Sequence, residues 1–432
     1  MHIKKHLGFN GLIKQISQRF GQIEDHRSRE GAYSIRDVMM SGLAMMFFQD
    51  PSMLQFQKRL TENFERNNLE TLFGVANIPS ETQMRDVIDA CPPEKTEIIF
   101  SDIFRELQRG KQLESFRVLE DRYLIVLDGT EYFSSDKIHC PGCLYHKKSK
   151  GGLRYHHQIV QAALVQPGCR QVIPLSPEAV RNEDGHEKQD CEINAGKRLI
   201  KKIRRQHAKL NIIIGGDSLY SKQPFIRALE EVGMSYVLVA KPGDHPSMFE
   251  WVAEITKMNE IGRWEFAESE KRSHRYEWVN GLPLGADPKA PEVNFFQYHL
   301  MVNGKVTYYN SWVTDVPVGK ENVIELTRIG RARWKIENET FNTLKNQGYH
   351  IEHNFGHGRQ NLSYNFFLLN LLAFFCHQIF ELTDPLYRAA RAAIGSRREY
   401  WNQLRCTIRI WVFPSWESLL ATVWNPKQHP PP

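Results

Sequence analysis

The segment Arg122–Phe133, which reads RYLIVLDGTEYF, constrains the fold more than any other stretch of the chain. Tyr123–Leu127 are all apolar or aromatic, and Asp128 and Gly129 close the run. A short apolar run of this kind is typical of a strand buried on both faces of a sheet. Asp128 then has two interpretations. It is a strand-end turn residue, because Asp-Gly is a common turn pair, or it is a carboxylate fixed at the tip of a central strand where it can hold a metal.

Size and composition set broad limits. The chain has 432 residues, which predicts two or three structural units. A hydrophobic content of 41% and a charged content of 25% describe an ordinary globular chain. With 56 basic and 50 acidic residues, the net charge is +6, which is compatible with an anionic partner. Composition alone does not separate a nucleic-acid enzyme from a metabolic one.

Targeting and membrane signals are weak. The segment 1–15 is amphipathic without a long apolar core, so we expect no signal peptide. The most apolar stretch, Asn365–Leu382, contains Asn370, His377 and Gln378, which predicts a buried core helix and no membrane partner. The seven cysteines are odd in number and scattered, as expected for a reduced cytoplasmic protein.

The order of predicted elements indicates the organisation of the chain. Residues 1–115 are expected to be helical, with Ser80 and Gln83 placed for a capping box. These helices form either a helix-turn-helix array, with Gln83 and Arg85 facing a DNA groove, or a plain dimerisation or packing domain. Residues 118–243 follow as β-β-β-α-β-α-β, which indicates a mixed sheet flanked by helices.

The second half of the chain contains an interruption. Residues 244–325 are rich in Tyr, Trp, Phe and Val, and Asn303-Gly304 is a hairpin turn signal, so we expect an inserted β subdomain. Residues 326–382 are expected to complete the core with one long helix (321–348 in full) and one buried helix. Residues 383–432 are expected to form a basic helical C-terminal region. Six arginines against one acid in 385–410 favour a polyanion-facing element.

Two more acidic residues stand where a carboxylate site would need them. Asp217 ends the predicted strand Leu210–Gly215, and Glu337 lies in the helical segment RARWKIENETFNTLK. Arg333 and Glu337 are four residues apart and therefore share one helix face. The alternative is an ordinary surface ion pair. Trp334 and Ile336 weigh against it, because they would bury the neighbouring faces.

At this point the chain resembles the DDE transposases of bacterial insertion sequences, in the group with a Tyr-Arg-Glu-Lys signature. The matching segments are LIVLDGT, IIIGGDSLY, and VTDVP followed by RWKIE, and the resemblance covers Val118–Phe380. It implies a ribonuclease-H-like α/β core, with Asp128, Asp217 and Glu337 as the catalytic acids and metal ligands. It also implies double-stranded DNA as partner (transposon ends and target), a homodimer on DNA, and a bacterial cytoplasmic location associated with the nucleoid when bound.

The chemistry of that family explains three carboxylates. Phosphodiester cleavage and strand transfer are in-line displacements, in which two Mg²⁺ ions activate the attacking oxygen and stabilise the leaving one. Mg²⁺ prefers carboxylate oxygens and keeps several waters, and Mn²⁺ is the expected substitute. We therefore expect Mg²⁺ as the cofactor.

The sequence departs from the family signature in two places. The signature Tyr should stand three residues before Arg333, where this chain has Gly330, so its hydroxyl is missing or comes from Tyr220 or Tyr349. Lys345 follows Glu337 by eight residues where the signature has seven, which turns it away by about 100° on a regular helix.

A one-residue π-bulge between Glu337 and Lys345 would restore their alignment, and such bulges favour functional sites. Glu339 is the fallback for the third carboxylate. Its spacing from Arg333 is wrong, so Glu337 is preferred.

Other candidate sites surround the strand that ends at Asp128. Arg333 and Lys345 are expected to contact DNA phosphates, as are the bases of the Gly-containing loop that follows the strand: Lys147, Lys148, Lys150 and Arg154. The basic helix Cys191–His207 is expected to be a solvated helix face.

The same loop holds a compact group of potential zinc ligands: His139, Cys140, Cys143 and His146. A Cys-x-x-Cys knuckle with a nearby His could bind Zn²⁺ at Cys140 and Cys143. The alternative is a plain thiol-bearing loop, because a fourth ligand at convincing spacing is absent. His156 and His157 are expected to alternate across a strand. Glu183, Asp184 and Glu187 are expected at the surface.

The sequence thus predicts a DNA transposase that cleaves at the ends of its element and joins them to target DNA. The alternatives are a structure-specific nuclease or resolvase of the same fold, or a DNA-binding protein that has lost catalysis. A glycosidase using Asp128 and Glu131 is rejected, because residues i and i+3 of one strand point to opposite faces.

Overall fold

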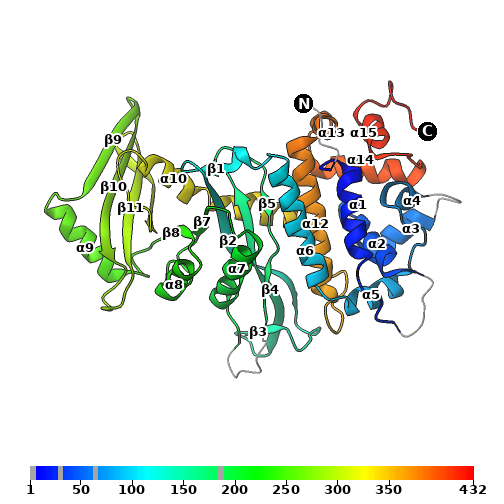
Figure 1. The fold of residues 1–432 in the computed structure, drawn as a ribbon, viewed down its shortest axis with the longest axis horizontal. Coiled ribbons are helices and arrows are strands. Elements are labelled where there is room, and N and C mark those ends of the chain that lie inside the picture. The colour runs from blue at the N-terminus through cyan, green and yellow to red at the C-terminus, as the bar shows by residue number, and fades with distance from the viewer. Residues whose placement is uncertain (1–5, 28–32, 62–66, 182–188) are drawn as a thin grey trace.

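The computed structural model describes residues 6–27, 33–61, 67–181 and 189–432. Within them the fold is mixed α/β, and twelve strands form one sheet (Figure 1). This is consistent with a ribonuclease-H-like transposase fold. The strands are β1 (Arg117–Val118), β2 (Arg122–Ser135), β3 (Leu144–Lys147), β4 (Leu153–Val165), β5 (Ile173–Pro174), β6 (Glu178–Val180), β7 (Ile212–Gly216), β8 (Ser235–Val239), β9 (Gly262–Ser269), β10 (Arg272–Pro283), β11 (Glu292–Val302) and β12 (Lys305–Thr314).

The helices gather at one end of the sheet and on its two faces. They are α1 (Phe9–Phe20), α2 (Ile35–Phe47), α3 (Met53–Thr61), α4 (Asn68–Phe73), α5 (Glu81–Ala90), α6 (Glu94–Arg109), the 3₁₀ turn η1 (Glu114–Phe116), α7 (Glu192–Gln206), α8 (Gln223–Glu231), α9 (Pro246–Lys257), α10 (Val323–Arg331), the π-helical segment η2 (Ile336–Phe341), α11 (Asn342–Asn346), α12 (Leu362–Thr383), α13 (Pro385–Ile394), α14 (Arg397–Ile410) and α15 (Trp416–Trp424).

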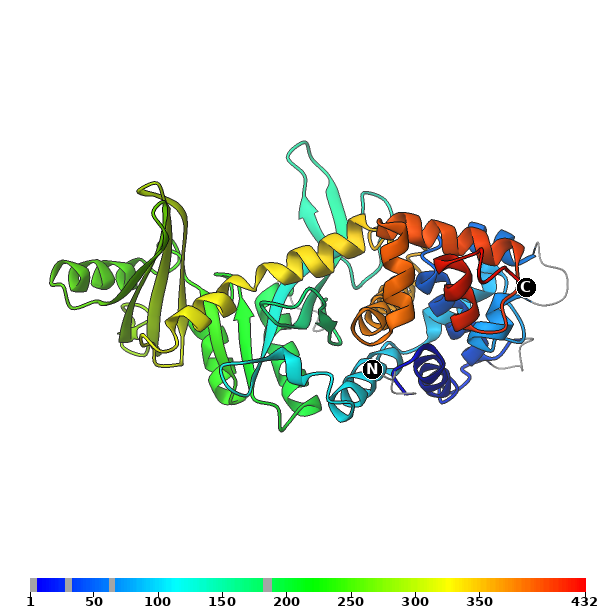
Figure 2. The same ribbon diagram turned by 90° about the horizontal axis from the view of Figure 1, so that it is seen from above.

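The sheet is parallel only at its centre. Its order is β3-β4-β2-β7-β8-β12-β11-β10-β9, and the β2/β7 and β7/β8 pairs are parallel. Helices α7 and α8 lie on one face, and α10 with η2 crosses the other (Figures 1 and 2). Cover on both faces explains why β7 is buried along its whole length and why β2 carries an uninterrupted apolar run.

The inserted strands extend the main sheet. β12 pairs antiparallel with β8 through Trp312, Val313 and Thr314, so β9–β12 continue the sheet beyond the parallel core. Helix α9, which the sequence analysis did not expect, precedes these strands. Asn303 and Gly304 both have positive φ and make the predicted hairpin turn between β11 and β12.

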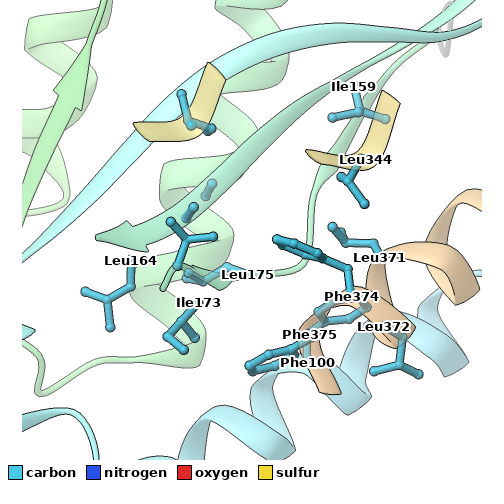
Figure 3. Packing of buried hydrophobic residues seen from close by; sticks show 14 of the residues in the cluster. Phe100, Ile159, Leu164, Ile173, Leu175, Leu344, Leu371, Leu372, Phe374 and Phe375 are labelled. Carbon is cyan, nitrogen blue, oxygen red and sulfur yellow. The ribbon is translucent and has the colours of Figure 1, made fainter. Parts of the chain in front are cut away.

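Helix α12 is the centre of the helical end of the molecule. Asn365 on α12 donates hydrogen bonds to the carbonyls of Ile88 and Cys91. Asp89 on α5 accepts the backbone N–H of Leu362, at the N-terminus of α12. Figure 3 shows the aromatic and aliphatic side chains through which α12 and α6 meet the sheet; the rings of Phe100 and Phe375 stack there at 6.0 Å. Helices from both ends of the chain therefore share one core.

Among the described helices, α12 is long and apolar enough to cross a membrane, but 83% of its most apolar window is buried inside the protein. This is weak evidence for a span, and the buried core helix expected from the sequence accounts for it. The predicted capping box of Ser80 and Gln83 is present at the start of α5. Glu183, Asp184 and Glu187 lie outside the described residues.

The predicted long helix 321–348 is interrupted. α10 ends at Arg331, and the chain resumes as the π-helical segment η2 and then α11. Gly330 packs against the ring of the buried Trp312, and a Cβ at Gly330 would lie 2.5 Å from the indole nitrogen. No side chain fits there, so packing excludes a tyrosine from the position where the transposase signature has one.

Candidate active site on the edge of the parallel strands

Two of the three predicted acids lie at the same level of two adjacent strands. The prediction that Asp128 ends its strand is wrong, because β2 continues to Ser135 and Asp128 lies in its middle. β2 and β7 are parallel and in register, with Val126 opposite Gly215. Asp128 lies two residues further along β2, and Asp217 follows β7 directly. The Asp217 carboxylate accepts the N–H of Leu219 at 2.9 Å. Because Asp128 and Asp217 each lie two residues past the last pair between β2 and β7, Val126 and Gly215, both carboxylates belong to one corner of the parallel part of the sheet.

Glu337 lies on η2, on the sheet face opposite α7 and α8, and Arg333 connects it to Asp128. The Arg333 Nη1 atom lies 2.5 Å from Glu337 Oε1 and 3.9 Å from Asp128 Oδ2. The guanidinium therefore bridges the helix-borne acid and the strand-borne acid. Glu339 lies beside Arg170, with 3.8 Å between Arg170 Nε and Glu339 Oε2. The geometry thus associates Glu337 with Asp128.

Glu192 is a fourth carboxylate in the same cluster, and it was not predicted from the sequence. It accepts hydrogen bonds from Tyr220 Oη and Gln158 Nε2, both at 2.9 Å. It also lies against Gly129, where an added Cβ would be 2.2 Å from Glu192 Oε2. An acid in the first turn of a helix is ordinary, because it complements the helix dipole, so its residue type gave no signal.

The cluster carries more negative charge than Arg333 balances. Burial raises the pKa of Asp128 to about 7; Arg333 lowers it, while Glu337, Asp217 and Glu192 raise it further. Burial also raises the pKa of Glu192, although the hydrogen bond from Tyr220 lowers it. Although burial alone would lower the pKa of Arg333, its bond to Glu337 and the charges of Glu337 and Asp128 raise it. Unbalanced, partly buried carboxylates of this kind suit a divalent cation with oxygen ligands.

The carboxylates lie near one another, but they do not surround a single position that a metal ion could occupy. Among the described residues, no three of them bring their oxygen atoms within 4.8 Å of one another. Glu337 is held by Arg333, and Glu192 by Tyr220 and Gln158. Side-chain movement is therefore needed before three of these acids could share one ion.

The π-helical segment η2 contains Glu337 and ends at Phe341, before Lys345, so it covers the first half of the eight-residue separation that called for an extra residue. Lys345 Nζ pairs with Glu352 at 2.8 Å. Of the two tyrosines that could replace the signature hydroxyl, Tyr220 lies beside the carboxylates. Tyr349 is buried in the helical end of the molecule, where its hydroxyl bonds His377 at 2.6 Å.

The basic loop after Asp128 is a projecting hairpin between β3 and β4 (Figure 2). Lys148 pairs with Asp136 at 3.1 Å, and Arg154 donates to Ser134. Lys147 and Lys150 are exposed on the same hairpin. These side chains lie within reach of an external polyanion.

The basic helix α7 is different, because several of its cations are used inside the fold. Arg198 pairs with Glu178 and Asp190, and Lys202 pairs with Glu97 and Glu178. Arg204 donates to backbone carbonyls, including that of Val232. A structural role therefore accounts for these three side chains without DNA.

Of the four zinc ligands suggested by sequence proximity, the two cysteines lie together and the two histidines lie elsewhere. Cys140 and Cys143 lie together, but His139 stacks on Tyr155 and His146 stacks on His156. The histidines that meet the two thiols are His157 on β4 and His357 before α12. His156 and His157 alternate across β4 as expected, with His156 buried.

Comparisons with known proteins address the part of the chain that carries two of the acids. Residues 166–375, just under half of the chain and including Asp217 and Glu337, match the transposase DDE domain family. No curated protein matches the chain. Among solved structures, the chain is similar to the crystal structure of the NurA nuclease from Sulfolobus solfataricus, with 14% identity, 56% of this chain and 84% of that chain covered, and a TM-score of 0.25. A TM-score this low carries no argument, so the comparison that bears on this chain is the match of residues 166–375 to the transposase DDE domain.

Proposed function

We propose that this chain is a transposase that cleaves DNA at the ends of its insertion sequence and joins those ends to target DNA by two-metal phosphoryl transfer. One observation carries the proposal. Asp128 and Asp217 lie just past the last pair between the parallel strands β2 and β7, and Arg333 links Asp128 to the helix-borne Glu337. Asp217 and Glu337 lie within the segment that matches a transposase DDE domain.

The proposed metal ligands are Asp128, Asp217 and Glu337. Carboxylate oxygens are the ligands that Mg²⁺ and Mn²⁺ prefer. Burial raises the pKa of Asp128, and the charges of Glu337, Asp217 and Glu192 raise it further although Arg333 lowers it. When bound, the two metal ions would activate the attacking oxygen and stabilise the leaving oxygen at phosphorus.

The remaining polar side chains have roles that follow from their contacts. Arg333 holds Glu337 in the free protein. In a complex with DNA its guanidinium would turn to a phosphate oxygen, because Arg pairs with phosphate as readily as with carboxylate. That exchange would release Glu337 toward Asp128. Glu192 would add negative charge next to Asp128, and the hydrogen bond from Tyr220 would hold its carboxylate in place.

DNA contacts are proposed on the side chains that lie outside the core. The projecting hairpin would place Lys147, Lys148, Lys150 and Arg154 against phosphates, together with Arg333 and Lys345. The helices of residues 1–115 would bind transposon ends or form the dimer. Residues 383–432 would add a basic surface.

The roles of the acids are tested by separating cleavage from binding. Asp128→Asn, Asp217→Asn and Glu337→Gln should each abolish Mg²⁺-dependent cleavage of DNA that carries the element's ends, while band shifts of the same DNA remain. Glu339→Gln is the matched control, since it removes an acid from the same helix that lies beside Arg170. Full cleavage by any of the three variants would refute that residue's role, and loss of cleavage in Glu339→Gln alone would transfer the role to Glu339.

A further inference from the structure

Four potential metal ligands from three distant parts of the chain converge at the base of the projecting hairpin. Cys140 and Cys143 lie in the connection between β2 and β3, His157 is on β4, and His357 is in the loop before α12. One ligand atom from each, two sulfurs and two nitrogens, lies within 4.8 Å of all the others. His357 is 214 residues from Cys143 in sequence, so only the tertiary fold assembles this group.

The distances match the edges of a tetrahedral zinc site. Zn–S bonds of about 2.3 Å and Zn–N bonds of about 2.0–2.1 Å require edges of about 3.8 Å between sulfurs, about 3.6 Å between sulfur and nitrogen, and about 3.3 Å between nitrogens. The sulfurs of Cys140 and Cys143 are 3.9 Å apart. His157 Nε2 lies 3.6 Å and 3.4 Å from them. His357 Nε2 lies 3.4 Å from Cys143 Sγ and 3.1 Å from His157 Nε2.

Hydrogen bonds around the group orient it for a metal. His357 Nδ1 lies 3.1 Å from the carbonyl of Gly358, to which it donates. In the neutral ring this leaves the Nε2 lone pair directed at the thiols, which is the arrangement found in metal-binding histidines. The backbone N–H of Cys140 also points to Cys143 Sγ at 3.5 Å, so the knuckle itself supports a thiolate.

The loop that presents His357 is shaped to hold it there. Gly356 and Gly358 both have positive φ, and a Cβ at Gly358 would lie 2.4 Å from an Asp89 carboxylate oxygen. Asp89 in turn accepts the N–H groups of the four residues 359–362. The position of His357 is therefore fixed by the start of α12 and by α5, and not by the thiols alone.

We propose that Cys140, Cys143, His157 and His357 bind one Zn²⁺ ion in a closed, structural site that ties the β2–β3 connection and β4 to the start of α12. Four protein ligands leave no open position for substrate, so the ion would stabilise the fold and take no part in the chemistry. Two thiolates and two neutral imidazoles would balance the charge of the dication. The site lies next to the strand that carries Asp128 and holds the base of the basic hairpin in place.

The test is the metal content of the full-length protein, purified under reducing conditions without chelator. About one Zn²⁺ per chain is expected by mass spectrometry of the metal. Protein stripped of metal should take up Co²⁺ with the intense visible absorption of a tetrahedral thiolate complex. A wild-type chain that neither retains Zn²⁺ nor gives this spectrum would overturn the proposal.

Matched variants assign the ligands. Cys143→Ser and His357→Ala should lose the bound Zn²⁺, whereas His139→Ala and His146→Ala, which alter the two neighbouring histidines outside the group, should keep about one ion per chain. Equal loss in His139→Ala and His357→Ala would refute the ligand set. Removing Zn²⁺ should lower the unfolding temperature of the wild type and leave that of a folded Cys143→Ser unchanged.

This site is independent of the proposed transposase activity. Asp128→Asn should retain Zn²⁺ in full although it abolishes Mg²⁺-dependent cleavage. If Asp128→Asn retains Zn²⁺ and the wild type does not cleave DNA, the proposed function fails and the zinc site stands.

Discussion

Replacing Asp128 by Asn should stabilise the Mg²⁺-free protein while destroying its metal site. The pKa of Asp128 rises from 3.8 to about 7 on folding, mainly through burial. Because the folded pKa is the higher one, the cost of ionisation is absent below the unfolded pKa and grows as the pH rises to about 7. A difference of about 3 in pKa corresponds to about 4 kcal/mol at pH 8.

Asn removes this cost but leaves an amide facing Arg333, so the expected net gain in unfolding free energy is about 1–3 kcal/mol. Urea unfolding at pH 8 in Mg²⁺-free buffer measures it, with Glu339→Gln as the control for loss of an acid outside the cluster. Added Mg²⁺ should then stabilise the wild type and not Asp128→Asn, because ligand binding to the folded state alone shifts unfolding. Destabilisation of the Mg²⁺-free protein by Asp128→Asn, or equal Mg²⁺ stabilisation of both proteins, would refute the reasoning.

Three further outcomes are expected. Gly129→Ala should weaken Mg²⁺ binding measured by calorimetry, because its Cβ would displace the Glu192 carboxylate; unchanged affinity would show that Glu192 is not part of the site's charge balance. Arg333→Ala and Lys345→Ala should each reduce the salt dependence of DNA binding by about one unit of slope, and an unchanged slope for either would remove it from the phosphate contacts. Burial lowers the pKa of His207 to about 4, so the wild type should lose about 3 kcal/mol of stability from pH 6.5 to pH 4, and His207→Gln should lose clearly less in the same urea titrations.

The strands at the centre of the fold could be predicted because their residues allow few alternatives. The apolar run before Asp128 and the Ile-rich run before Asp217 are buried on both faces, and only a covered sheet offers that environment. The π-helical turn could also be predicted, because Lys345 follows Glu337 by one residue more than the corresponding Lys does in the family signature.

The missed parts depend on contacts between distant segments. Glu192 looks like an ordinary helix-start acid, and only the absence of a side chain at Gly129 admits its carboxylate to the cluster. His357 joins the Cys140 loop through the turn at Gly356 and Gly358, which no local spacing reveals. Sequence proximity instead suggested His139 and His146, whose rings stack elsewhere.

The glycine at position 330 has the same kind of cause. The close approach of Gly330 to Trp312 belongs to the packing of α10 against the extended sheet. The absence of a tyrosine at position 330 could be read from the sequence, whereas its cause, the contact with Trp312, is visible only in the structure.

The proposed function requires that this protein both cut and join DNA. The most direct measurement incubates the wild-type chain with Mg²⁺, labelled DNA carrying the parent element's ends, and a plasmid target, and then separates the products on a gel. We predict labelled ends covalently joined to the plasmid, and no joined product with Asp128→Asn. Nicked or cut DNA without joined product would identify a nuclease, and a shifted band without any cleavage would identify a DNA-binding protein; either result would contradict the proposed transposase function.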